Sequence, residues 1–191
     1  MTLDPLSPAA RELLRLNAET AYTELLPRQP GPAAAGDRLH SMSPADVIAG
    51  KIADANDAAC VLAGLWLWHD FLDESHTICQ AIETPSGSYL HAIMHRREGD
   101  FGNAKYWYAR VPTHPIFTAL AAQASDLVAS APASKALLRL TSNGWNGAAL
   151  VDLIQQVHES PSDPRYELAV ALQQMEWRVL FDHCLRGAAG Q

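Results

Sequence analysis

The sequence has few cysteines, and they form no recognisable framework. Cys60, Cys79 and Cys184 stand far apart, and none belongs to a CxxC pair. This spacing excludes a disulfide scaffold. We therefore expect three reduced, buried thiols in a protein of a reducing compartment.

A long apolar run is also missing. No stretch approaches the roughly 18 uninterrupted apolar residues that a membrane-spanning helix needs. The first residues, MTLDPLSPAARELL, lack the basic and apolar regions of a secretory signal. These observations predict a cytoplasmic protein without a membrane partner.

Positive charge is scarce, since 14 Lys and Arg stand against 21 Asp and Glu, for a net charge of -7. This balance gives no electrostatic reason to expect a nucleic-acid partner. The segment from His91 to His114 is an exception, because four basic residues there outnumber two acidic ones. The common catalytic signatures GxSxG, GxxxxGK[ST] and GxGxxG are absent.

Helix signals recur along the chain, whereas strand signals are scarce. Ser-Pro pairs, which suit a helix start, precede segments with apolar residues at helical spacing. The longest apolar segment, 56–82, predicts a central helix, and 87–98 and 103–111 predict the next two. We expect an all-α single domain over 1–191, a bundle or array of about eight antiparallel helices. The segment 27–42 is predicted to be a loop, and 187–191 a flexible tail.

Two resemblances concern the middle of the chain. The segment HAIMHRREGDFGNAKYWYARVPTHP resembles an uncharacterised protein family with an HxxxHRRE and NAKYW pattern, which implies a shared fold and no activity. Within it, the spacing of Ala104, Tyr108 and Pro115 resembles the second half of a tetratricopeptide unit. The latter resemblance implies a helix pair of the kind found in protein-interaction modules.

Histidines and acids gather on two predicted helices that a short turn joins. Residues four and seven apart share one helix face, so His69, Asp73 and His76 lie within an arc of roughly 60° on the first helix. On the second helix the same spacing joins His91, His95 and Glu98. Because a short turn makes such helices antiparallel neighbours, the two rows are expected to face one cleft.

Imidazoles and carboxylates on facing helices are how helical bundles assemble zinc, iron or manganese centres. The candidate ligands of a divalent metal are His69, His76, His91 and His95. The candidate catalytic residues are His91, His95, Glu98 and Asp73, with the acids as ligands, orienting groups or general bases. A metal-free pocket and a purely structural network of hydrogen bonds both remain open.

The locally basic segment supplies candidates for contacts to a small-molecule ligand. Guanidinium groups form forked contacts with carboxylates or phosphates, and dense aromatic rings suit a small organic molecule. Salt bridges between neighbours and core packing explain the same residues equally well. The candidate ligand-binding residues are Arg96, Arg97, Asn103, Lys105, Tyr106 and Trp107.

We expect a small-molecule binding or catalytic pocket between helices, with or without a divalent metal. The alternative is a protein-interaction module of helical hairpins, similar to tetratricopeptide units, in which the histidines form a structural network. A Trp-rich face, if exposed, favours a homodimer.

Overall fold

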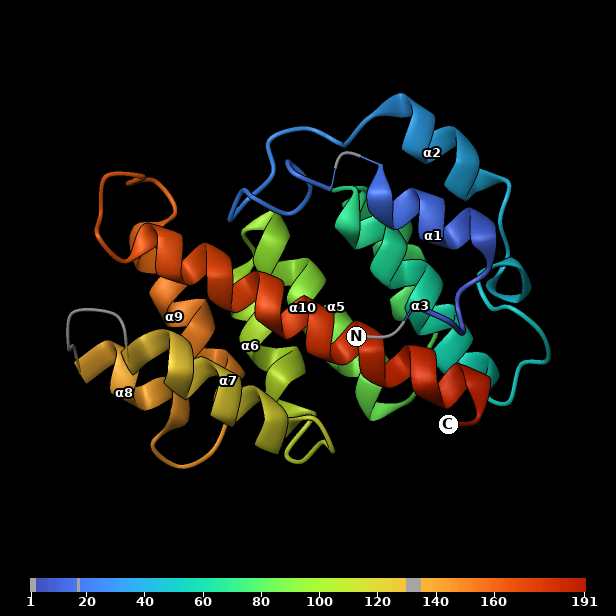
Figure 1. Cartoon of the computed structure of the whole chain (residues 1–191). Coiled ribbons are helices and arrows are strands. Elements are labelled where there is room, and N and C mark those ends of the chain that lie inside the picture. The colour runs from blue at the N-terminus through green and yellow to red at the C-terminus, as the bar shows by residue number, and fades with distance from the viewer. Residues whose placement is uncertain (1–2, 17, 130–134) are drawn as a thin grey trace.

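The computed structural model describes residues 3–16, 18–129 and 135–191, and over these residues it is all-α, as predicted (Figure 1). Regular structure here is helical, and two isolated β-bridges join loops. None of the described helices combines the length and the apolar character needed to cross a membrane. The helices are α1 (Pro8–Arg15), α2 (Ala33–His40), the 3-10 turn η1 (Pro44–Asp46), α3 (Ala55–Trp68), α4 (Leu72–Cys79), α5 (Pro85–Glu98), α6 (Phe101–Ala109), α7 (Phe117–Ala129), α8 (Lys135–Thr141), α9 (Gly147–Val157) and α10 (Tyr166–Ala189).

Several helices begin at a polar residue whose side chain accepts a backbone hydrogen bond. Ser7 caps α1 and Thr84 caps α5, each followed directly by proline. Asp54, Asp100 and Asn146 cap α3, α6 and α9 in the same way. A side-chain acceptor satisfies one of the amide groups that a helix start leaves free. The Ser7-Pro8 start agrees with the structure, whereas α5 begins at Pro85, before the predicted 87, and α6 begins at Phe101, before the predicted 103.

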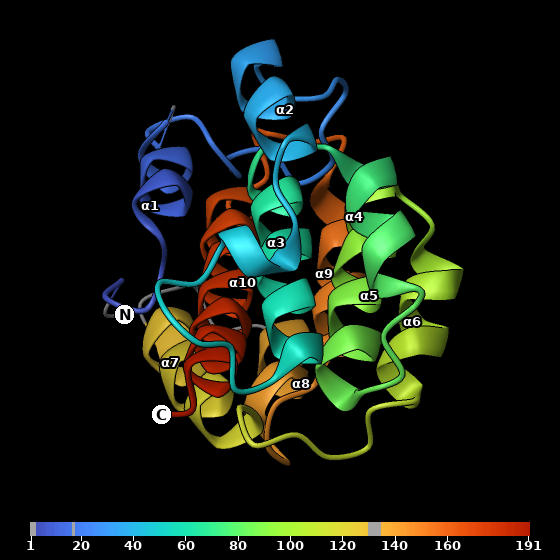
Figure 2. The same ribbon diagram turned by 90° about the vertical axis from the view of Figure 1, so that its right-hand side faces the viewer.

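The long helix α10 packs along α3, and these two helices form the centre of the molecule (Figures 1 and 2). Trp177 donates a hydrogen bond from its indole nitrogen to the Gly64 carbonyl at 3.0 Å. A Cβ at Gly64 would lie 2.8 Å from the Phe181 ring, so the glycine permits the close approach. The helix pair α5 and α6 packs on the same core, with α9 against α6.

The predicted central helix over 56–82 is wrong in one respect, because it is two helices. α3 ends at Trp68, and α4 begins at Leu72. Between them Asp70 has a φ of 60°, a left-handed conformation that turns the chain. The apolar pattern runs through this break, since residues on both sides are buried against the same core.

Other predicted boundaries also differ from the structure. The helix that follows Ser7 is short and ends at Arg15, and the predicted loop 27–42 contains α2. Three successive alanines open α2, and their helix propensity together with burial of Leu39 outweighs the proline and glycine signals around them. The predicted tail 187–191 is mostly the last turn of α10, in which Ala188 is buried.

Candidate functional site

Three of the four histidines predicted as metal ligands converge on one point. His76 comes from α4, whereas His91 and His95 lie one turn apart on α5. Each contributes a ring nitrogen that lies within 4.8 Å of the others. The ring centroids of His91 are 4.7 Å from His76 and 4.6 Å from His95. We call His76, His91 and His95 the His cluster, and their spacing is one that could hold a metal ion.

His91 is the most enclosed member of the His cluster. Its side chain is buried, and neither ring nitrogen has a hydrogen-bond partner among the described residues. The ring stacks on Trp107 of α6, with centroids 4.0 Å apart. Burial lowers the pKa of His91 to about 4, with smaller contributions from His95 and His76. A neutral imidazole with two unused nitrogens is an available metal ligand.

His95 is oriented by two neighbours. Its Nδ1 lies 2.5 Å from Oε1 of Glu98, and its Nε2 lies 3.0 Å from the side-chain amide nitrogen of Asn103. If Nδ1–H donates to the carboxylate, then Nε2 presents a lone pair, as in a carboxylate–histidine–metal arrangement. Asn103 covers that lone pair, so metal binding at Nε2 requires the amide of Asn103 to turn away.

The remaining predicted ligand, His69, belongs to a different part of the molecule. It stands at the end of α3, where Nε2 lies 3.0 Å from the Leu13 carbonyl of the α1 region. Burial lowers the pKa of His69, and its Nδ1 has no partner among the described residues. The predicted arc of His69, Asp73 and His76 assumed a continuous helix, and the turn at Asp70 removes it.

Asp73, predicted as a catalytic acid, is exposed in the first turn of α4. With Glu74 and the loop Pro27–Pro30 it lines a shallow hollow of about 290 Å³. This hollow includes no member of the His cluster. Asp73 therefore does not belong to the His cluster, although helical spacing predicted that it would lie with these histidines.

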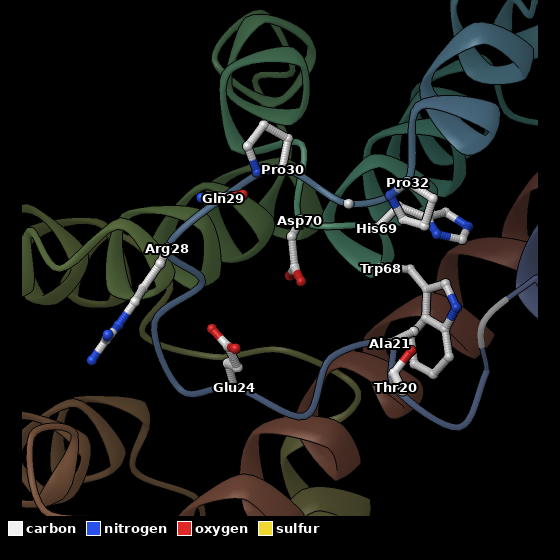
Figure 3. A pocket seen from close by; sticks show the side chains of 11 residues that line it. Thr20, Ala21, Glu24, Arg28, Gln29, Pro30, Pro32, Trp68, His69 and Asp70 are labelled. Carbon is white, nitrogen blue, oxygen red and sulfur yellow. The ribbon is translucent and has the colours of Figure 1, made fainter.

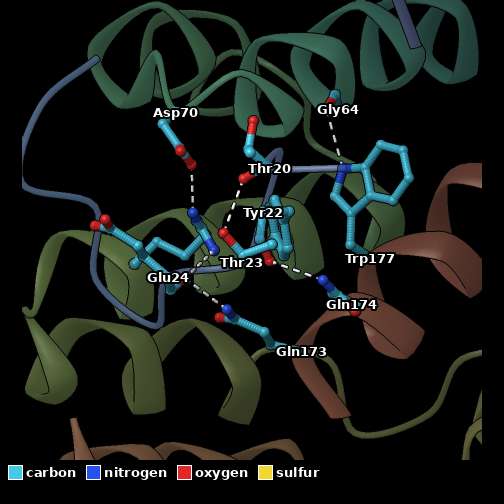
Figure 4. A network of polar contacts seen from close by, with 10 residues as sticks. Thr20, Tyr22, Thr23, Glu24, Gly64, Asp70, Gln173, Gln174 and Trp177 are labelled. Atoms are coloured by element: carbon cyan, nitrogen blue, oxygen red, sulfur yellow. Dashed lines mark hydrogen bonds and ion pairs between the residues drawn. The ribbon is translucent and has the colours of Figure 1, made fainter. Parts of the chain in front are cut away.

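Arg96 and Arg97, predicted as ligand-binding residues, are completely buried. Arg96 pairs with Glu176 of α10 at 2.5 Å, and Arg97 pairs with Asp70 and donates to the Glu24 carbonyl. Figure 4 shows the second of these networks, in which Asp70 faces the guanidinium group and Gln173 also reaches Glu24. Both arginines therefore have carboxylate partners within the core, which a buried guanidinium group needs, and neither is free to bind a ligand.

The ligand-binding residues predicted on α6 have mixed surroundings. Asn103 and Trp107 touch the His cluster directly. Lys105 instead pairs with Asp152 of α9 at 2.5 Å. Tyr106 is 56% exposed, and its hydroxyl accepts a hydrogen bond from Arg110 at 3.3 Å.

A cavity of about 330 Å³ lies beside the break between α3 and α4 (Figure 3). Figure 3 shows the carboxylates of Glu24 and Asp70 extending toward each other across it, with Arg28 pointing away. This cavity could not be predicted from the sequence, because its lining residues come from the segment 20–32 and from the end of α3, which are far apart in the chain. No local spacing relates Glu24 to Asp70.

The comparisons with protein-family models, with curated proteins and with solved structures found no match. Support for a function therefore comes from the residues of this chain alone.

Proposed function

We propose that this protein binds a divalent transition metal, with zinc as the best fit, through His76, His91 and His95. The observation that carries the proposal is the convergence of three imidazoles around His91, whose two buried nitrogens are unpaired. A buried polar group without a partner costs about 1–3 kcal/mol. A metal ion would provide a partner for one of the two His91 nitrogens, the one that carries the lone pair.

The residue types support zinc over magnesium or calcium, because imidazole nitrogen suits zinc, copper, iron and nickel. Zinc–nitrogen bonds of about 2.0–2.1 Å would bring the three ligand nitrogens to roughly 3.4 Å from one another. The nitrogens now lie within 4.8 Å, so small rotations of the rings would suffice. Glu98 would orient His95 from behind rather than bind the metal.

Three histidines leave a fourth position on zinc for water or a small molecule. Zinc lowers the pKa of a bound water to about 7, which supplies a nucleophile for hydrolysis. Asn103, Trp107 and the neighbouring Tyr106 would contact the small molecule, since α6 packs against this part of α5. We therefore propose a hydrolytic or ligand-binding metal centre as the role of the His cluster.

Elemental analysis of the tag-free protein after zinc loading and removal of free metal tests this proposal. The His91→Ala, His95→Ala double variant should lose one zinc equivalent relative to the native chain. The matched control is His158→Ala, because His158 packs on Phe101 and lies outside the His cluster. The control should keep the native zinc content.

An unchanged zinc content in a folded double variant would overturn the proposal. The predicted interaction module of helical hairpins would then be the better hypothesis.

A further inference from the structure

A second group of metal-ligating side chains lies between α3 and α10, and it shares no residue with the His cluster. Asp57 and Cys60 are three residues apart on α3, and Cys184 faces them from α10. One carboxylate oxygen and the two sulfur atoms lie within 4.8 Å of one another. Both thiols are almost fully buried, at 2% and 1% exposure.

The backbone brings the two helices close together at this point. The amide of Ala53 donates to the Ala188 carbonyl at 2.8 Å, which ties the start of α3 to the end of α10. A Cβ at Gly187 would lie 1.9 Å from Oδ2 of Asp57, so only glycine lets α10 approach this carboxylate. Figure 1 shows the start of α3 beside the end of α10, close to the C-terminus.

Both thiols belong to the apolar core, but polar side chains lie near them. Cys184 has Cys60 and Ser86 of α5 as side-chain neighbours. The Ser86 hydroxyl lies 3.1 Å from Nε2 of His114, and the His114 ring packs against His183 at 4.9 Å. The surroundings thus hold further nitrogen and oxygen atoms, unlike an apolar pocket for an inert thiol.

We propose that Asp57, Cys60 and Cys184 form a second metal site, which takes a soft divalent cation such as zinc and clips α10 to α3. Zinc binding converts both thiols to thiolates and releases two protons, while the Asp57 carboxylate supplies the third ligand. Asp57 is only half-buried, so water can occupy the fourth position.

The geometry favours a metal over a pair of unmodified thiols, because three ligand atoms from two different helices lie within 4.8 Å of one another. A divalent cation would offset the charges of two thiolates and a carboxylate gathered in one place.

This proposal is independent of the His cluster, and cobalt distinguishes the two. Cobalt(II) bound to thiolate gives an intense near-ultraviolet charge-transfer band that histidine ligands do not produce. The reduced protein, loaded with cobalt(II), should show this band, and so should the His91→Ala, His95→Ala variant. Cys60→Ser and Cys184→Ser should each abolish it.

Cys79→Ser is the matched control, because Cys79 is the third buried thiol and its sulfur contacts the His76 carbonyl outside the second site. It should keep the band. Asp57→Asn keeps both cysteines and so tests the second site even if a cysteine variant misfolds. It should weaken the zinc affinity of the second site at least about tenfold while circular dichroism stays native.

Absence of the band in the reduced, folded native chain would overturn the second site, even if the His cluster held zinc. A band that persists in Cys60→Ser or Cys184→Ser would also overturn it. Conversely, a thiolate band with no change in zinc content for His91→Ala, His95→Ala would support the second site and contradict the His cluster.

Discussion

Arg96 and Glu176 form a fully buried ion pair. Both side chains are 0% exposed, and Tyr108 hydrogen-bonds to each of them. Tyr89 also donates to Glu176, and Trp145 donates to Tyr89. Burial lowers the pKa of Arg96, but Glu176, Tyr108 and Tyr22 together more than offset it, so the net shift is upward and Arg96 stays charged.

Replacing one partner of this pair should be far more harmful than replacing both. Glu176→Leu leaves the Arg96 charge buried without a partner, and we expect the free energy of unfolding to fall by about 3–5 kcal/mol. The double variant Arg96→Met, Glu176→Leu should lose less, since neither charge remains. Urea unfolding measures both values. A double variant less stable than the single one would contradict this account.

At the scale of elements, the packing of α3 on α10 depends on the absence of a side chain at one position. The Phe181 ring occupies the space that a Cβ at Gly64 would take. Gly102 of α6 offers the contrast, because it is exposed and a Cβ there would meet only Asp100, at 3.7 Å. Both glycines are helical, so alanine brings a similar gain in helix propensity at each.

Gly64→Ala should destabilise the protein by roughly 1–3 kcal/mol, because the Phe181 ring must move to admit the methyl group. Gly102→Ala should be neutral or stabilising by up to about 1 kcal/mol. The difference in unfolding free energy between the variants reports the packing alone. Equal stabilities would show that α10 can adjust without loss.

For the whole molecule, several histidines are buried in their neutral form. Burial is the largest cause of a lowered pKa at His69, at His91 and at His114, and the last two fall to about 4. The unfolded chain binds these protons near pH 6.5, whereas the folded chain resists them. Above about pH 6.5 these histidines are neutral in both states and the stability of the folded chain is at its full value. As the pH falls toward 4, protonation of the unfolded chain lowers that stability.

Metal-free protein should accordingly melt several degrees lower near pH 5 than near pH 7. Differential scanning calorimetry at constant ionic strength measures this change. His114→Gln should reduce the pH dependence, because it removes one of the buried titrating groups. A melting temperature that rises on acidification would have the opposite sign and would contradict the prediction.

The pairing of His91 with His95 could be predicted from sequence because both lie within one uninterrupted helix. Their spacing of four residues places them one turn apart whatever surrounds α5. His76 lies beside them because a short turn connects α4 to α5. His69 did not, since the periodicity that grouped it with His76 crosses a left-handed residue that no apolar pattern reveals.

The helical class, the start of α1 and the pairing of the two histidines of α5 follow from the sequence, because they depend on spacing and capping over a few residues. Which charged and thiol groups became partners in the core depends on the tertiary structure. Arg96 meets Glu176 from 80 residues away, and Cys184 meets Cys60, which lies more than half the chain earlier. Such pairs follow from the packing of α10 across the other helices, and local spacing carries no information about that packing.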